Sequence, residues 1–246
     1  MIIKRILIVC SLFIFLGSFA LAKVTQLNYK ATFGIFGTVG TIKNILTQND
    51  NTYKIKTKVQ LAGMAKSILG GQVEDYISTG HIENGLMISD KYTMTSTKKN
   101  KIVKKEYHIN HKTKSITKRY RKWIKGKLTK DYTQKLKFYA KDDLLTLYFN
   151  IGHAVKEKGK TYNFRAVGLE KQNGKVQITV PSDKKTARYK QDLGKANLYA
   201  KALIYQKNFR NKKGDILLGI DKDGFIKKSV IKDILMFGDA KLVRTK

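Results

Sequence analysis

A helical period appears in the middle of this sequence, at Asp142-Asp143-Leu144-Leu145-Thr146-Leu147-Tyr148-Phe149-Asn150-Ile151-Gly152. Elsewhere apolar and polar residues mostly alternate with a period of two, which is typical of half-buried strands. One face of the predicted helix carries Leu144, Leu145, Tyr148 and Ile151, and the other a polar stripe of Asp143, Thr146, Asn150 and His153. The Asp pair suits the start of a helix and Gly152 its end. Because so short a helix is marginal alone, we predict that a curved sheet packs around it.

The composition excludes a disordered chain and points to a basic surface. The protein has 246 residues, of which 42% are hydrophobic, and a formal net charge of +32. Such a charge attracts anionic partners such as phospholipid head groups or acidic glycans. Only seven of the 50 basic residues are Arg, however, and diffuse Lys is also a common solubilising feature of strands. Both interpretations of the charge stay open at this stage.

The N-terminus predicts export. Lys4 and Arg5 precede the apolar run from Ile6 to Leu16, and Ala20-Leu21-Ala22 resembles a cleavage site for signal peptidase. We therefore expect a signal peptide over residues 1–22, cleaved after Ala22, and a single periplasmic domain over residues 23–246. An uncleaved anchor is the alternative. The only cysteine, Cys10, falls in this segment, so the mature chain has no disulfide or thiolate chemistry, and export disfavours nucleic acid as a partner.

Strand and turn signals fill most of the remaining chain. Residues 53–61 alternate apolar side chains with lysines, and three turns, Asn84-Gly85, Asn173-Gly174 and Asp223-Gly224, predict antiparallel hairpins. Residues 62–71 are expected to form a short helix or an apolar flap, and residues 182–195 a loop or short helix. The predicted fold is mainly β: one curved antiparallel sheet, an open barrel or half-barrel, around one short central helix, preceded by the signal helix.

Residues 98–141 combine many basic residues with interleaved aromatic ones. This pattern is typical of surfaces that bind nucleic acid, carbohydrate or membrane interfaces, and equally of long strands with one buried face. If the surface is functional, the candidates for binding anions are Arg119, Arg121, Lys122 and Trp123.

No catalytic or metal-binding motif stands out. His108 and His111 would lie on opposite faces of a strand, and Asp221-x-Asp223-Gly224 lacks the later Glu of a calcium loop. No nucleophile motif is present either. The sequence therefore predicts no metal site and no cofactor, and a binding protein rather than an enzyme, although a catalytic set assembled only in space stays open.

The order of several short motifs resembles a known family. The residues that carry the resemblance are Asp142 to Phe149, then Gly168-Leu169-Glu170-Lys171-Gln172-Asn173-Gly174, and the strand pair around Asp221-Lys222-Asp223-Gly224. Together they resemble the exported bacterial family called domain of unknown function 3108 over most of the mature chain. The resemblance implies a periplasmic, barrel-like antiparallel sheet and no established activity.

Two functions follow as hypotheses. In the first, the protein holds an apolar or amphipathic ligand, such as a lipid, acyl chain or lipoprotein tail, with a basic rim that meets an anionic head group. The candidate lining residues are Phe33, Phe36, Tyr53, Ile55, Val59, Leu61, Met64, Ile68, Leu69, Leu145 and Tyr148. In the second, the chain is a structural or adaptor protein that binds anionic envelope surfaces through its lysine-rich strands. The first hypothesis would fail if these residues were simply filled core.

Overall fold

The computed structural model describes residues 22–68, 71–169, 171–205, 209, 213–234 and 238–245. Apart from Ala22, the expected signal peptide lies outside the described residues, and so does Leu69. None of the helices in the described part of the chain is both long and apolar enough to span a membrane.

The strands form one sheet of 15 members in the order β8-β7-β6-β5-β4-β3-β2-β1-β15-β14-β13-β12-β11-β10-β9. The N-terminal strands are β1 (Lys23–Phe33), β2 (Gly37–Gln48), β3 (Thr52–Leu61), β4 (Val73–Glu83), β5 (Leu86–Lys98), β6 (Lys101–Asn110), β7 (Ser115–Ile124) and β8 (Lys127–Lys135). The C-terminal strands are β9 (Asp142–Asp143), β10 (Thr161–Val167), β11 (Lys175–Thr179), β12 (Leu198–Ile204), β13 (Gly214–Ile220), β14 (Ile226–Ile234) and β15 (Gly238–Arg244). Neighbours pair antiparallel except β9 and β10, which pair parallel.

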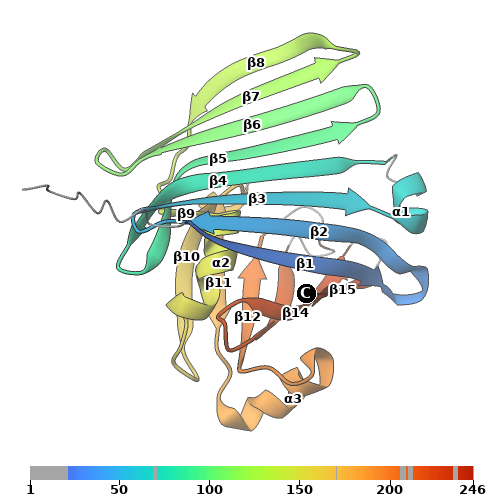
Figure 1. Cartoon of the computed structure of the whole chain (residues 1–246), viewed down its shortest axis with the longest axis vertical. Helices are drawn as coiled ribbons and strands as arrows, with labels where there is room; N and C mark the ends of the chain where they lie inside the picture. The colour runs from blue at the N-terminus through green and yellow to red at the C-terminus, as the bar shows by residue number, and fades with distance from the viewer. Residues whose placement is uncertain are drawn as a thin grey trace, which may run out of the picture.

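The sheet bends around the helix α2 (Leu144–Ala154), as Figure 1 shows. Strands β1 to β8 spread across one side, β10 to β15 lie on the other, and α2 sits between them. The order begins with β8 and ends with the two-residue β9, and these two strands do not pair with each other, so the sheet is curved but open. The predicted mainly β fold with an open, curved antiparallel sheet is confirmed.

Helix α2 is central because it contributes to three apolar clusters. Leu147 and Ile151 pack against strands of the C-terminal half, and Phe149 packs against Leu27, Tyr29 and Tyr53 of the N-terminal half. Leu144 and Leu145 also contact a third cluster, which includes buried residues of β5, β6 and β7. The helix is therefore buried by apolar contacts on several sides, and this burial stabilises a segment too short to persist alone.

Both segments for which the sequence left a short helix as one of two alternatives contain a helix. Besides α2, the described residues form α1 (Gly63–Ile68), α3 (Asp183–Leu193) and the 3₁₀ helices η1 (Gly34–Phe36) and η2 (Gln172–Gly174). Helix α3 packs on the outer face of the sheet, where Leu193 contacts Tyr199 and Val230. The polar composition of this segment left a loop and a short helix as alternatives, because only a narrow stripe of the helix is buried.

The three predicted hairpins are present. At the tip between β4 and β5, Asn84 and Gly85 have φ of 52° and 76°, the left-handed pair that a tight two-residue turn requires. The other two connect β10 to β11 and β13 to β14. Gly152, in contrast, does not end its helix, which continues to Ala154.

Candidate binding groove and polar network

Three of the four residues of the predicted polar stripe, Asp143, Thr146 and Asn150, face the sheet and are buried, whereas His153 is exposed. Thr146 is fully buried and Asn150 is 5% exposed. The side chain of Asn150 forms the pair of hydrogen bonds with the backbone of Met87 in β5 that a neighbouring strand would form. Its Nδ2 donates to the carbonyl of Met87 (2.7 Å), and its Oδ1 accepts from the Met87 amide (3.1 Å). These polar residues therefore fix how the helix sits against β4 and β5 rather than facing water.

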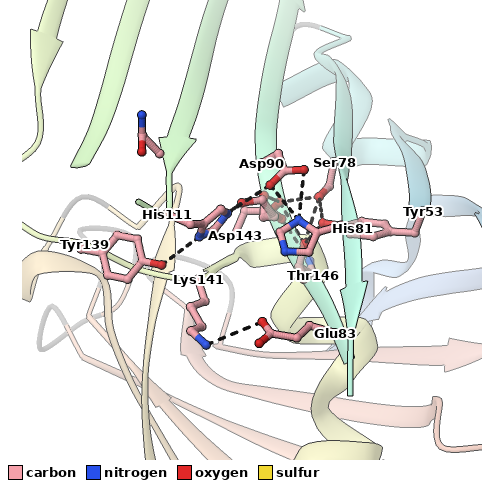
Figure 2. A network of polar contacts seen from close by, with 12 residues as sticks. Tyr53, Ser78, His81, Glu83, Asp90, His111, Tyr139, Lys141, Asp143 and Thr146 are labelled. Carbon is pink, nitrogen blue, oxygen red and sulfur yellow. Dashed lines mark hydrogen bonds and ion pairs between the residues drawn. The ribbon is translucent and has the colours of Figure 1, made fainter. Parts of the chain in front are cut away.

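Asp143 is the centre of this network (Figure 2). Its carboxylate caps α2 by accepting from the amides of Leu145 (2.7 Å) and Thr146 (3.0 Å), which confirms the predicted capping role. It also accepts from the hydroxyls of Ser78 (2.5 Å) and Ser89 (2.6 Å), which come from β4 and β5. Burial raises the pKa of Asp143, while these donors favour its charged form. Since the group is fully buried and well supplied with donors, its role is structural.

Asp142, the other member of the pair, has a different environment. Burial, and then the neighbouring Asp143 carboxylate, raise the pKa of Asp142 to about 7. A donor from Asn150, 3.3 Å away, and the charge of Lys141 only partly oppose this rise. The charge of Asp142 therefore changes near neutral pH.

A second polar cluster lies beside the first, toward the surface. The Nδ1 atom of His81 lies 3.0 Å from Asp90 Oδ1, and the Nε2 atom of His111 lies 3.1 Å from the same oxygen. The other ring nitrogen of His111 lies 2.8 Å from the Tyr139 hydroxyl, whose pKa is raised by burial and by nearby carboxylates. Among the described residues, His81, Asp90 and His111 form the group whose ligand atoms could share one metal ion.

The inward face of β6 to β8 forms a groove of about 370 Å³, within the range of roughly 300–1,000 Å³ found for small-molecule sites. The strand residues that line it are Lys105, Tyr107, Lys118, Tyr120, Tyr132 and Gln134, and the segments beside them add Leu136, Phe138, Gly168 and Leu169. The rings of Tyr120 and Tyr132 stack with their centroids 5.0 Å apart. The groove therefore offers both aromatic surface and cations.

Lys118 is the least usual residue of this groove. It is 8% exposed, and its Nζ lies 5.8 Å from the centroid of the Tyr107 ring. Its neighbours on the same face of β7 are Ile116, which is fully buried, and Tyr120. A lysine in such surroundings interacts with an anion more strongly than a lysine in open water, because the local dielectric constant is lower.

The described residues that were predicted to line a ligand cavity differ widely in burial. Tyr53 and Ile55 are 3% and 0% exposed and pack against Phe149 with Leu145 and Tyr148, so they are filled core. Val59, Leu61 and Phe33 are half-buried, and Phe36 is 37% exposed. Met64 and Ile68 belong to α1. Helix α2 occupies the space next to β3, where the cavity was predicted. The groove lies instead beside β6 to β8 and is lined by other residues.

The predicted anion-binding residues divide between the two faces of β7. Arg119, Arg121 and Trp123 share the outer face, and Lys122 points inward with Lys118 and Tyr120. Arg119 forms a bidentate ion pair with Asp131, in which Nε lies 2.9 Å from Oδ1 and Nη2 lies 2.6 Å from Oδ2. Arg121 pairs with Glu106. Although burial opposes it, the hydrogen bonds from Lys104 and Arg121 lower the pKa of Glu106. The two arginines are thus already bound to carboxylates.

A sequence signal for the groove did exist. Ile116, Lys118, Tyr120 and Lys122 occupy one face of a strand and mix apolar with basic residues. Such a mixture weakens the case for an ordinary core face and is what an inward-facing, partly hydrated surface would show. No comparable signal marks His81, Asp90 and His111, which come from three different segments.

Comparisons with known proteins leave the family open. No family model matches the chain, and no curated protein matches it. Among solved structures, it is similar to the crystal structure of a beta-barrel-like protein of domain of unknown function DUF1849 from Brucella abortus. The two are 11% identical over 90% of this chain and 95% of the other, with a TM-score of 0.49. A likeness this distant carries no argument about function, and the resemblance to domain of unknown function 3108 stays a prediction.

Proposed function

We propose that the protein is an exported binding protein that holds one anionic amphiphile, an acyl chain with a carboxylate head group, in the groove below β6 to β8. The observation that carries this proposal is the placement of Lys105 and Lys118 among tyrosines on the inward face of the sheet. Lysines on an outer face need no partner but water. Lysines that line an aromatic groove can form charge-assisted hydrogen bonds to a ligand carboxylate in addition to the interactions that they already make within the chain.

The chemistry of the groove fits both ends of such a ligand. Tyr120, Tyr132 and Phe138 offer apolar ring surface, and burying an acyl chain against it contributes about 25 cal/mol per Å² before the costs of association. The ammonium groups of Lys105 and Lys118 can donate charge-assisted hydrogen bonds to a carboxylate. Export rests on the sequence of residues 1–22, and it would place the protein where free fatty acids and lipids occur.

Two of the predicted anion-binding residues support the alternative adaptor role less well. An adaptor for anionic surfaces needs cations that are available to its partner. Arg119 and Arg121 instead pair with Asp131 and Glu106, so binding an external anion there would first require breaking these ion pairs.

The direct test is binding of a fluorescent long-chain fatty acid, such as an anthroyloxy-stearic acid, to the purified mature protein. Lys118→Gln and Lys105→Gln should each weaken binding by about 10- to 100-fold, since a hydrogen bond to a charged group contributes about 1.5–3 kcal/mol. Arg119→Gln is the matched control, because it removes a cation from the outer face of the same strand, and it should leave binding unchanged.

Two results would overturn the proposal. One is the absence of saturable binding of the fatty acid to a folded protein. The other is an equal loss of affinity in Lys118→Gln and Arg119→Gln, which would indicate attraction by the net charge alone. Native mass spectrometry of protein from the periplasm adds an independent check: a mature mass that begins at Lys23, and a co-purified lipid that is depleted in Lys118→Gln.

A further inference from the structure

We propose that His81, Asp90 and His111 bind a single divalent transition-metal ion of the zinc class, at a site separate from the groove. Two imidazole nitrogens and one carboxylate oxygen make up the donor set found in many zinc sites. Such sites keep a further position for water or another ligand.

The spacing of the donor atoms fits one ion. Asp90 Oδ1 lies 3.0 Å from His81 Nδ1 and 3.1 Å from His111 Nε2. All the ligand atoms lie within 4.8 Å of one another. Metal–ligand bonds of about 2.0–2.2 Å place neighbouring ligands of a tetrahedral ion about 3.3–3.6 Å apart. Small side-chain movements would therefore suffice to bind the ion.

An irregularity in the sheet brings the three residues together. Thr79 pairs with Lys91 and Gly80 with Ser89, so Asp90 is the extra residue of a β-bulge in β5. His81 follows Gly80 on β4, and His111 lies just beyond the end of β6. A Cβ atom at position 80 would lie 1.9 Å from the carbonyl oxygen of Ile88, so this close approach of the two strands requires glycine.

Tyr139 supports the orientation of His111, as Figure 2 shows. Its hydroxyl lies 2.8 Å from His111 Nδ1. In a metal-bound form, Nδ1–H donates to the Tyr139 oxygen and the lone pair of Nε2 faces the ion. Metal-binding histidines usually have a second hydrogen-bond partner of this kind. Without the ion, Nε2–H can donate to Asp90 or to the carbonyl of Ser89, 3.0 Å away, and the Tyr139 hydroxyl donates to Nδ1 instead.

The site is accessible from solvent. The side chains of His81, Asp90 and His111 are 41%, 48% and 25% exposed, and a hollow of about 360 Å³ adjoins both histidines. Glu83 and Lys141, whose charged groups lie 4.0 Å apart, line the same hollow. A metal ion can therefore enter without unfolding, and the hollow leaves space for a ligand on its open side.

The test is titration of the purified, folded protein with ZnCl₂ by calorimetry, and with CoCl₂ by visible absorption. We expect one ion per chain and the intense cobalt bands of a four- or five-coordinate site. His81→Ala and His111→Ala should abolish this binding. Asp90→Asn keeps the size of the side chain and should weaken it strongly. Tyr139→Phe removes the hydrogen-bond partner of His111 Nδ1 and should weaken binding by about 10- to 100-fold, as the loss of such a partner does in other metal sites.

His108→Ala is the matched control, because His108 is an exposed histidine on β6 that lies outside the cluster. It should bind Zn²⁺ as the unmodified protein does. Near-ultraviolet circular dichroism of each variant checks that the fold is retained. The proposal is overturned if no stoichiometric binding occurs, or if His81→Ala and His111→Ala bind as tightly as His108→Ala. Either outcome would leave the cluster as a hydrogen-bond network only.

Discussion

At the scale of single residues, two adjacent carboxyl groups show how burial separates chemically identical side chains. Asp143 has hydrogen-bond donors from two strands and its own helix. Asp142 has one donor from Asn150, at 3.3 Å. Asp143 therefore accepts hydrogen bonds that join the helix to the sheet. Asp142 stays protonated at pH values where an exposed Asp would be charged.

This difference predicts a pH dependence of stability. Burial and the Asp143 charge raise the pKa of Asp142 from the ordinary 3.8 to about 7. Between these values the folded state holds a proton that the unfolded state has released. The stabilisation that protonated Asp142 gives the folded state is therefore fully present below about pH 4 and is lost as the pH rises through 7. Asp142→Asn mimics the protonated form, so the variant should be more stable than the unmodified protein at pH 8 and nearly equal to it at pH 3.5.

The measurement is urea unfolding at both pH values. The gain at pH 8 should be a few kcal/mol at most, since one pKa unit corresponds to about 1.4 kcal/mol. Asp50→Asn, in the exposed turn before β3, is the control and should change stability little at either pH. A variant equally stabilised or destabilised at both pH values would show that Asp142 does not titrate in this range.

At the scale of elements, the central helix is fitted to the sheet by a close backbone contact. A Cβ atom at Gly152 would lie 2.1 Å from the carbonyl oxygen of Gly224, in the turn between β13 and β14. The Asp223-Gly224 hairpin therefore does more than connect two strands. It rests directly on the last turn of α2, and glycine at both positions permits the approach.

Gly152→Ala tests this contact, because two effects of opposite sign compete. Helix propensity alone would stabilise the protein by about 1 kcal/mol. Overpacking against Gly224 typically costs about 1–3 kcal/mol, and here the overlap is with backbone, which yields little. We expect a net loss of stability and a lower midpoint of thermal unfolding. A stabilised variant would show that the helix and the hairpin are not in contact.

At the scale of the whole molecule, the open sheet leaves a long strand at its edge. β8 pairs with β7 alone among the described strands, and all of its residues are exposed. Exposed edges invite pairing with other chains, and lysines are a common protection against it. Lys127, Lys130 and Lys135 lie on this edge, which gives part of the large positive charge a physical role that requires no anionic partner.

Replacing these three lysines with threonine should therefore promote self-association. We expect dimers or larger species in size-exclusion chromatography with light scattering, increasing with protein concentration. The matched control replaces Lys54, Lys56 and Lys58, exposed residues of β3, a strand that is paired on both sides. It removes the same charge and should stay in the state of the unmodified protein. Equal behaviour of the two variants would mean that net charge, and not the edge, controls association.

Much of this protein follows from the sequence by itself. Alternation with a period of two, Asn-Gly and Asp-Gly turns and one helical segment predicted the mainly β fold, its hairpins and the capping by Asp143, because each depends on residues near one another in the chain. Only the tertiary structure decided which inward-facing residues are filled core and which line a groove. Helix α2 fills the space beside Tyr53 and Ile55, Lys118 lines the groove, and Thr146 and Asn150 of the helix are buried. The tertiary structure also joined His81, Asp90 and His111 across a bulge. Period and propensity do not fix the curvature of the sheet or the position of its bulges, and these two features decide which distant side chains meet.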